Sequence, residues 1–552
     1  MLRRDFLSTL CAGAAVNALP RAAKLSRPNT LDLRVPVRLA VSCISNRMDP
    51  SMGYRPWFLV EVKDSKPIHL RHDVWDFGDM SGRFLEGLIL ARNMFDPTKS
   101  MLQDEGRIRG FLGSHLGPDG LVMNPDKHDV DHMFAQGSAL YGLVTDFNDG
   151  HSITVKGRIR SLIDGLNKRA RQEDDYLWFP EVATPIAPCS HMAAYQALPV
   201  VRFYELTSEP SALRYAERLS RWAFYHDPTV TNRGVITKTG WEGHLHAWMD
   251  TYSGIIRCAR AGGNLDRKEV VTRAHLLFEW VKQNYTTPYG WVADSVGSET
   301  CETCTISSAI RLALELIKEG YTDYWDDVER FVRNQVIQNQ FRDVDRLGIE
   351  DEATVRGLTG CFESYAAPNT LIASRDAGIE GCCINGGIRA LFLAYANAIQ
   401  ESDEAIQINL LVSNATPGVR VVSYLPFEGR LDLYPRSGKP LKVRLPKWLR
   451  AEDVTANGPS GLQQAVDKDG HFMRLSGATL GTRITLTLKP RDEPVTSDVA
   501  RHHYDVAWRA DNVMKLEPAG KPYPIYRNDS LPDRQVSPEL ETALYKQPKV
   551  RW

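Results

Sequence analysis

The chain reads CETCTISSAIRLALELIK over residues 301–318 and GCCINGGIRALFLAYAN over residues 381–397. Apolar side chains recur every three or four residues in both stretches, which predicts helices over 305–318 and 384–400. Each stretch therefore brings cysteines to the start of a helix that has an apolar face.

The same apolar spacing recurs along the chain from about residue 75 to residue 400. Turn signals such as Gly262-Gly263-Asn264 separate the periodic segments. About a dozen helices over some 320 residues are typical of a toroid of helical hairpins. We therefore predict an (α/α) barrel, as the domain of residues 31–400.

The periodicity changes near residue 405, where apolar and polar residues begin to alternate. Ile406, Ile408 and Leu410 show this alternation. Gly, Pro and Asn separate such runs, so we predict an antiparallel β domain, a sandwich over residues 401–495. The polar remainder, residues 496–552, contains several prolines and is expected to be an extended segment packed on the rest.

The composition argues against two classes of partner. The 552 residues carry a net charge of −1, so no basic field would attract a nucleic acid. No apolar run reaches the ~18 residues that a membrane-spanning helix needs. We therefore expect neither a nucleic-acid partner nor a membrane span.

An export signal is predicted at the N-terminus. Residues 3–7, RRDFL, precede a mildly apolar stretch, as in a twin-arginine signal. A chance Arg-Arg pair at a ragged terminus is the alternative. We expect residues 1–30 to be signal and linker, and the protein to be periplasmic or secreted. Since that route carries folded proteins, a metal–thiolate site loaded in the reducing cytoplasm can be exported intact.

The cysteine clusters are the strongest chemical signal in the chain. Three or four thiols with one or two carboxylates can make a zinc site. A thiolate that zinc keeps deprotonated can also be a nucleophile. We predict that two loops at one mouth of the barrel close such a site, with the ligands Glu302, Cys304, Cys382 and Cys383.

Other cysteines have a simpler interpretation. Nine are present in all. An isolated cysteine is more often a small buried hydrophobic residue than a ligand. We interpret Cys43, Cys258 and Cys361 in this way.

Glu302-Thr303-Cys304 before a helix, with Cys382-Cys383-Ile384-Asn385 and Arg389 downstream, resembles glycoside hydrolase family 127, the β-L-arabinofuranosidase family. The segment LKVRLPKW at 441–448, followed by Asn457-Gly458, is similar to the sandwich domain of that family. The resemblance covers about residues 70–490. It implies an (α/α)6 barrel followed by an antiparallel β-sandwich.

The resemblance also implies a chemistry. It is hydrolysis with retention through a glycosyl-cysteine intermediate, the double displacement of retaining glycosidases with sulfur as the nucleophile. Cys382 would be that nucleophile. The cofactor would be Zn²⁺, bound by Glu302, Cys304, Cys383 and Cys382 itself.

A retaining glycosidase also needs a general acid/base. In the family this is a glutamate well upstream of the Glu-Thr-Cys motif, whereas Thr286 stands sixteen residues before Glu302 here. Asp294 and Glu299 are the nearby carboxylates, and we favour Glu299 because it is closer to the metal loop. Glu299 could equally be a further ligand, together with Cys301.

Histidines and one aromatic segment are the predicted sugar contacts. His244 and His191 resemble family histidines that contact the sugar, although a lone histidine on a helix is more often a satisfied core residue. A third family histidine is replaced here by a serine, and His132 nearby is expected to compensate. Trp75 and Asp76 are expected to supply a stacking face and a carboxylate, with a core tryptophan and a helix cap as the alternative.

Together these features predict an exported, zinc-dependent retaining glycosidase that removes β-L-arabinofuranosyl or a related unusual sugar from a glycan. A polysaccharide lyase on a similar toroid is a second interpretation; it would use His244 and Tyr252 and would not need zinc. A non-catalytic glycan-binding protein with a structural zinc site is a third. The sequence leaves the oligomeric state open.

Overall fold

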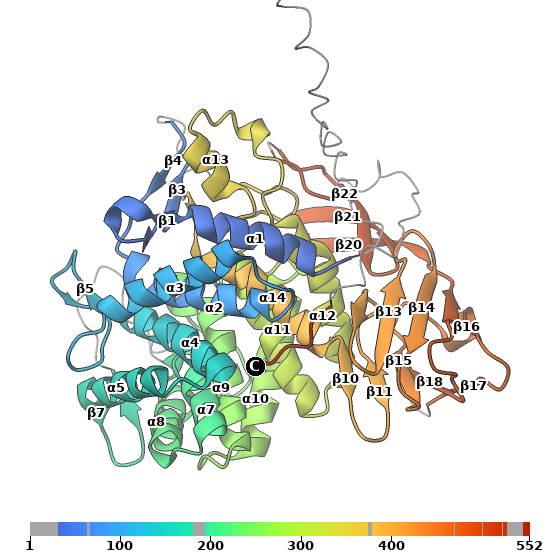
Figure 1. Cartoon of the computed structure of the whole chain (residues 1–552), viewed down its shortest axis with the longest axis horizontal. Helices are drawn as coiled ribbons and strands as arrows, with labels where there is room; N and C mark the ends of the chain where they lie inside the picture. The colour runs from blue at the N-terminus through green and yellow to red at the C-terminus, as the bar shows by residue number, and fades with distance from the viewer. Residues whose placement is uncertain are drawn as a thin grey trace, which may run out of the picture.

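The computed structural model describes residues 31–62, 67–179, 194–373, 378–467, 470–499, 501–521, 523–526 and 545–552. The predicted signal, residues 1–30, and His191 lie outside the described residues. Helices occupy the left and centre of the molecule in Figure 1, and most of the β-sheets lie to the right. None of the described helices combines the length and the apolar character needed to cross a bilayer.

Six of the described helices form an inner ring. They are α2 (Ser81–Arg92), α4 (Met133–Gly150), α7 (Ala197–Thr207), α9 (Leu245–Arg260), α11 (Thr303–Lys318) and α14 (Cys382–Asn397). Each packs on the next in this order, and α14 returns to α2, so the ring is closed. This closure confirms the predicted (α/α) barrel.

A second layer of helices covers the ring. It contains α1 (Arg34–Asn46), α3 (Lys99–Ser114), α5 (Ile153–Arg169), α8 (Pro210–Arg221), α10 (Arg267–Tyr285) and α12 (Trp325–Phe331), which continues as the π-helical turn η6 (Val332–Val336). Among them α8 packs on α7 and α9, and α10 packs on α9 and α11. The short α13 (Glu352–Leu358) packs on α1.

Composition explains which helices are inner. Helix α4 is buried continuously from Met133 to Asn148, as expected of an apolar helix that is surrounded by protein. Outer helix α8 buries only one stripe and presents charged residues on its other face. Gly82 on α2 brings two inner helices together, because a Cβ at this position would lie 2.3 Å from the carbonyl oxygen of Ser138.

Two five-stranded sheets follow the barrel. The first has the strand order β10 (Ile399–Glu401), β11 (Ile406–Ile408), β15 (Leu441–Arg444), β18 (Phe472–Ser476), β17 (Gln463–Val466). The second has the order β12 (Asn414–Ala415), β13 (Val419–Ser423), β14 (Arg430–Pro435), β19 (Ile484–Leu488), β16 (Val454–Asn457).

Pairing within these sheets is antiparallel except between β11 and β15, which run parallel. The alternating residues Ile406, Ile408, Leu441 and Val443 are buried, as the period of two requires for strands with one face in the core. The predicted β-sandwich is therefore present, with one parallel pair that the sequence pattern did not indicate.

The C-terminal part corrects one expectation. Residues 496–552 were predicted to be extended, but a three-stranded antiparallel sheet is formed by β20 (Asp492–Val499), β21 (His502–Arg509) and β22 (Asn512–Glu517). Tyr504, Val506 and Trp508 alternate with exposed residues and are buried. This is a strand signal of period two that charged neighbours obscured. Residues 545–552 end over the centre of the barrel (Figure 1), where Val550 is fully buried.

A small sheet anchors the segment that leads into α14. Strand β3 (Leu59–Glu61) lies between β4 (His69–Arg71) and β9 (Ile379–Glu380). Two-residue strand pairs complete the described chain: β1 (Met48–Asp49) with β2 (Arg55–Pro56), β5 (Met123–Asn124) with β6 (Asp129–Val130), and β7 (Arg171–Gln172) with β8 (Leu177–Trp178).

Buried ion pairs join the barrel to the sandwich. Arg444 on β15 is 4% exposed, and its guanidinium donates to the carboxylates of Asp326 and Glu329 on α12. Glu329 also accepts a hydrogen bond from Arg333 over 2.8 Å. Because each buried charge has an opposite partner, this contact holds α12 and β15 in one arrangement.

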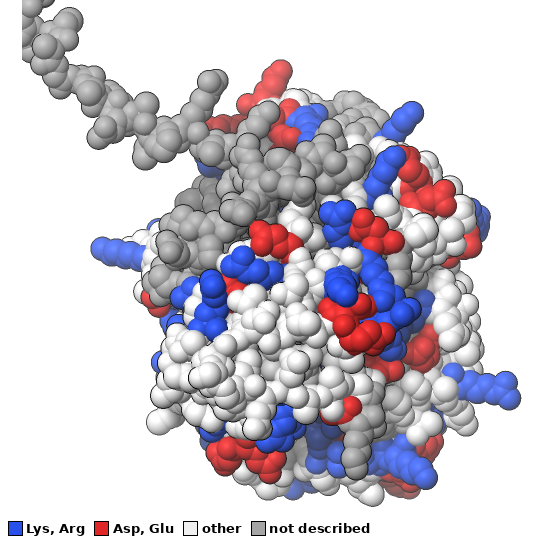
Figure 2. Space-filling view, turned by 90° about the vertical axis from the view of Figure 1, so that its right-hand side faces the viewer, with Lys and Arg blue, Asp and Glu red and all other residues white. Residues whose placement is uncertain are grey.

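Basic and acidic side chains of the described residues are interspersed on the face shown in Figure 2. This mixed surface agrees with the net charge of −1. The absence of a nucleic-acid partner stays a prediction.

Candidate functional site

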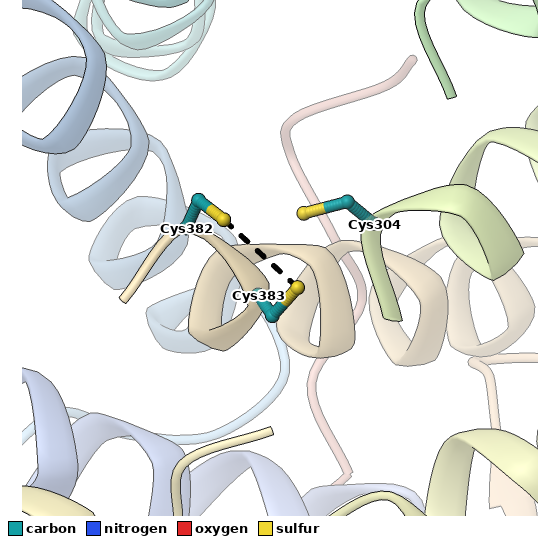
Figure 3. A group of neighbouring side chains, drawn as sticks. All are labelled: Cys304, Cys382 and Cys383. Carbon is teal, nitrogen blue, oxygen red and sulfur yellow. Dashed lines mark hydrogen bonds between the residues drawn. The ribbon is translucent and has the colours of Figure 1, made fainter. Parts of the chain in front are cut away.

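Three cysteine side chains converge where two inner helices begin (Figure 3). Cys304 is the second residue of α11, and Cys382 and Cys383 are the first two of α14. One ligand atom from each lies within 4.8 Å of the other two, and all three residues are buried. The Sγ atoms of Cys382 and Cys383 are 3.9 Å apart. The two cysteine stretches therefore meet in space and form a group that could hold a metal ion. We call Cys304, Cys382 and Cys383 the three-thiol group.

Glycine allows the two helices to come this close. A Cβ on Gly386, one turn into α14, would lie 2.9 Å from the Cα, the N and the Sγ of Cys304. A Cβ on Gly387 would lie 2.3 Å from the ring of Phe362. Any larger side chain at these positions would push α11 or its neighbouring loop away from α14.

The surroundings of the three-thiol group favour negative charge. Both helices direct their N-terminal ends at it, where free N–H groups and the helix dipole stabilise thiolates. Arg83 on α2 lies with Nη1 3.7 Å from the Sγ of Cys304. Hydrogen bonds from the other two thiols, followed by the charge of Arg83, hold the pKa of Cys304 well below its ordinary value. Contact with Cys304 raises the pKa of Cys382. These contacts favour negative charge on Cys304 more than on Cys382.

The three cysteines differ in their exposure to solvent. Cys382 is 7% exposed, Cys304 is 1% exposed and Cys383 is fully buried. Cys382 is therefore the member of the group that a molecule entering from solvent would reach first.

Glu302 is a neighbour of the three-thiol group but is not one of its members. It occupies the N-cap position of α11, where its side chain makes no capping hydrogen bond, and its Oε2 lies 3.3 Å from the Nε2 of His244. Burial raises the pKa of Glu302, and the opposing charge of His244 limits that rise. Glu302 precedes Cys304 by two positions in the sequence. Its predicted role as a ligand stays a prediction.

The two carboxylates that the sequence suggested for acid/base catalysis differ in position. Asp294 is 8% exposed, and its oxygens accept hydrogen bonds from Ser295 over 2.6 Å and Thr300 over 2.8 Å. Glu299 has a half-exposed side chain 3.5 Å from the guanidinium of Arg501, so its carboxylate faces solvent and the β20–β22 sheet. This placement does not support an acid/base role for Glu299.

Cys301 is not part of the three-thiol group. Its Sγ donates to the carbonyl oxygen of Glu302 over 3.5 Å and lies 3.8 Å from the Nδ2 of Asn339. Burial raises its pKa. Cys301 is thus a buried core thiol beside the start of α11.

Glu380 is a site residue that sequence reasoning missed. Its Oε2 lies 3.4 Å from the Sγ of Cys382, and its Oε1 accepts a hydrogen bond from the hydroxyl of Tyr365 over 2.8 Å. The backbone of β9 places it there, since Leu59 pairs with Glu380. Burial, and then the charge of Glu302, raise the pKa of Glu380 to about 8. The sequence feature that could have indicated Glu380 is its position, two residues before the first of the adjacent cysteines.

An aromatic wall runs from Trp75 toward the three-thiol group. Trp75 meets the ring of His132 at 4.1 Å and that of Phe134 at 6.4 Å, both edge to face. Phe134 in turn lies 5.9 Å from the ring of His246. His246 binds Ser308 through Nδ1 over 2.7 Å, and burial lowers its pKa well below the usual range. Phe134 and His246 were not predicted, because a helical apolar pattern gives no sign of which residues face a site.

Two predicted sugar contacts have structural partners instead. Asp76 is fully buried and accepts hydrogen bonds from Arg55 over 2.7 Å and from the backbone N–H of Phe58 over 3.0 Å. Its carboxylate is thus already engaged by these donors, and its contact with a sugar hydroxyl stays a prediction. His132 caps α4, since its Nδ1 accepts from the N–H of Ala135 over 3.1 Å, and burial lowers its pKa to about 4.

The donor set of the three-thiol group fits Zn²⁺. Thiolates are ligands that zinc prefers, and a structural or catalytic site needs one further donor to complete a tetrahedron. Two carboxylates are candidates for that donor. Glu302 precedes Cys304 by two positions in the sequence, and Glu380 contacts the sulfur of Cys382.

The fold is shared with solved glycosidase structures. No protein-family model and no curated protein matches the chain. A GH127 β-L-arabinofuranosidase from Geobacillus stearothermophilus T6 is similar, with a TM-score of 0.59 and 13% identity over 88% of this chain and 81% of that one. A second GH127 β-arabinofuranosidase has a TM-score of 0.59 and 14% identity over the same shares.

A third structure, described as a glycoside hydrolase, has a TM-score of 0.56 and 14% identity over 79% of this chain and 77% of its own. Sequence identity this low shows similarity of fold alone. The chain therefore has the fold of these hydrolases, an (α/α) barrel followed by a β-sandwich.

Proposed function

We propose that this protein is a zinc-dependent retaining glycoside hydrolase with Cys382 as its nucleophile. The observation that carries the proposal is the three-thiol group at the N-terminal ends of α11 and α14, on a fold similar to that of GH127 β-L-arabinofuranosidases. Zn²⁺ held by Cys304, Cys382, Cys383 and Glu302 would keep the nucleophilic sulfur deprotonated and oriented.

Accessibility supports Cys382 as the nucleophile. It is the most exposed residue of the group, at 7%. It also lies at the first position of α14, where the helix dipole favours a thiolate. Its neighbour Cys383 is fully buried and is suited only to holding the metal.

The proposed reaction is a double displacement. The Cys382 sulfur bonds to the anomeric carbon while the glycosidic C–O bond breaks and a carboxylic acid protonates the departing oxygen. The resulting carboxylate then takes a proton from a water molecule whose oxygen attacks the anomeric carbon. The C–S bond breaks, its electron pair returns to sulfur, and two inversions give net retention.

We propose Glu380 as the acid/base, with Asp294 as the alternative. The first step needs a carboxyl that holds a proton near neutral pH and lies close to the nucleophile. Glu380 contacts Cys382 at 3.4 Å, and burial raises its pKa to about 8. Asp294 is engaged by Ser295 and Thr300, which reduces its freedom to serve a substrate.

The substrate we propose is a glycan side chain that ends in β-L-arabinofuranose or a related unusual sugar. One similar structure is named a β-L-arabinofuranosidase and another a β-arabinofuranosidase. Trp75 and Phe134 offer aromatic surface for the C–H faces of a sugar ring, and His244 offers a hydrogen-bonding edge next to Glu302. Thr286 stands where the family has its acid/base glutamate. We therefore expect a substrate specificity that differs from that of the structurally similar hydrolases.

Hydrolysis of an aryl β-L-arabinofuranoside, with zinc and reductant present, tests the proposal. We expect aryl release with retention, seen by NMR, and a sugar adduct on Cys382, seen by mass spectrometry of trapped enzyme. Cys382→Ser should abolish release, whereas Cys258→Ser changes a buried cysteine on α9 and should not. No release by folded, zinc-loaded protein would refute the proposed substrate. An unsaturated product would indicate a lyase, and glycan binding without turnover would indicate a binding protein.

We also propose that the protein is exported in folded form, on the basis of the Arg3-Arg4 motif. A reporter fused to residues 1–30 should leave the cytoplasm only in cells with a working twin-arginine system. Export of an Arg3→Lys/Arg4→Lys fusion at the unchanged rate would contradict this proposal.

A further inference from the structure

We infer that Arg83 is a positioning residue that supplies the buried positive charge which the metal-loaded three-thiol group needs, and that it thereby sets the affinity of the group for a divalent metal. This inference rests on the zinc site of the proposed function. It adds to that site a residue that is not a ligand and that comes from a third inner helix.

Arg83 is held against the group from several sides. It lies on α2 and is 1% exposed. Its Nη1 is 3.7 Å from the Sγ of Cys304, and its Nε donates to the Oδ1 of Asp79 over 2.8 Å. The ring of Phe134 lies under the guanidinium, with 5.3 Å from its centre to the Cζ. A cation fixed in this way acts on the thiols at a constant distance.

The partner of Arg83 is fixed as well. Asp79 is 2% exposed, and its Oδ1 also accepts a hydrogen bond from the hydroxyl of Ser138 over 2.5 Å. Ser138 is on α4, which touches α2 closely at Gly82. The Asp79–Arg83 pair is therefore built into the contact between two inner helices, and it is not a mobile surface ion pair.

Charge balance gives the guanidinium its role. Three thiolates outweigh one Zn²⁺, so the loaded group carries a net negative charge in a buried place. Burying an anion without an opposite charge nearby costs free energy. Among the described residues, Arg83 places its positively charged guanidinium in contact with the sulfur of Cys304. Removing Arg83 takes away the positive charge that contacts the sulfur of Cys304, so the cost falls on the metal-loaded, negatively charged group.

Zinc affinity measured by competition with a chromophoric chelator tests the inference. Arg83→Met should weaken binding by about tenfold or more, which is the usual effect of removing a residue that supports metal ligands. Arg83→Lys keeps a positive charge and should restore most of the affinity. The Asp79→Asn/Arg83→Met variant leaves no buried carboxylate unpaired, so it separates metal binding from poor folding of the single variant; it should still bind zinc more weakly than the wild type, because the cation in contact with Cys304 is gone.

Cobalt binding gives a readout independent of turnover. Co²⁺ bound by the thiolates produces a charge-transfer absorption, which should appear at higher Co²⁺ concentration in Arg83→Met and near the wild-type concentration in Arg83→Lys. Arg47→Met is the matched control, because Arg47 is equally buried but contacts Cys361, with its Nη2 3.5 Å from that sulfur. It should leave both metal titrations unchanged.

The outcomes separate the inference from the proposed function. Wild-type zinc affinity in both Arg83→Met and the double variant would overturn the inference. Equal losses of zinc affinity in Arg83→Lys and Arg83→Met would also overturn it, because the positive charge would then not matter. A wild-type protein that binds neither Zn²⁺ nor Co²⁺ would refute the zinc site itself, and the role of Arg83 with it. Tight wild-type binding with weak binding by the two charge-removing variants, rescued by lysine, is the expected result.

Discussion

Replacing Gly386 by alanine tests the packing that brings the three sulfurs together. Gly386 lies in the first turns of α14, and a Cβ there would lie 2.9 Å from the Cα, the N and the Sγ of Cys304. All three of those atoms belong to the start of α11, so the contact cannot be relieved by the tip of a flexible side chain. We expect Gly386→Ala to move α11 away from α14.

The size of the effect follows from two opposing contributions. Relief of the contact from 2.9 Å to an ordinary 3.4 Å requires a shift of about 0.5 Å, which moves Cys304 relative to Cys382 and Cys383. Overpacking of this kind costs about 1–3 kcal/mol. Alanine is favoured over glycine inside a helix by about 1 kcal/mol. The metal-free variant should therefore be less stable than the wild type by up to about 2 kcal/mol.

Metal binding should be affected further, because a tetrahedral thiolate site requires sulfurs at a defined separation. We expect zinc affinity to fall by about tenfold or more, which removes about 1.4 kcal/mol of zinc-dependent stability. The assay is thermal unfolding with and without Zn²⁺, together with chelator competition.

Gly106 provides the matched control. It lies on helix α3, and a Cβ there would have nothing within 4 Å. Gly106→Ala should raise stability by about 0.5–1 kcal/mol, since only the helix propensity changes. If Gly386→Ala were stabilised to the same degree and bound zinc as the wild type does, close approach of the two helices would not be what assembles the site.

Three other predictions concern the site and its support. Cys382→Ser should keep most of the zinc but lose turnover, whereas Cys304→Ser should lose both; equal, mild effects on zinc content and rate would contradict the assigned roles. Burial raises the pKa of Glu380 from 4.5 to about 8, so the folded, metal-free protein holds a proton that the unfolded chain has lost. Its stability should therefore fall as the pH rises from about 4.5 to 8, and Glu380→Gln should flatten that dependence in denaturant titrations. Arg444→Met leaves the carboxylates on α12 without this counter-ion and should destabilise the fold by about 3–5 kcal/mol, measured by urea unfolding; an unchanged midpoint would show that the barrel–sandwich contact does not depend on the ion pairs.

Periodicity predicted the architecture because it is a local property. Apolar spacing of three to four residues marked helices such as 305–318, which is observed as α11 over Thr303–Lys318. Alternation marked the strands of the sandwich. The same rule missed β20–β22, where Tyr504, Val506 and Trp508 alternate with Asp505 and Ala507, and where flanking histidine and arginine residues made the segment look polar on average.

The sequence by itself determined the residue types of the site: two cysteine-bearing stretches, each at the start of a helix with an apolar face. It could not determine which carboxylates face them. Asp76 looked available but is occupied by Arg55, and Glu299 looked close but faces solvent near Arg501.

Only the tertiary structure decided how the site is charged and shaped. Arg83 is 221 positions from Cys304 in the sequence, yet its guanidinium touches that sulfur. Glu380 acquires its raised pKa from burial and from Glu302, which lies on another segment. Local pattern depends on neighbours three or four positions away, whereas the contacts, burial and charge that give a side chain its chemistry come from residues that meet only when the ring of helices closes.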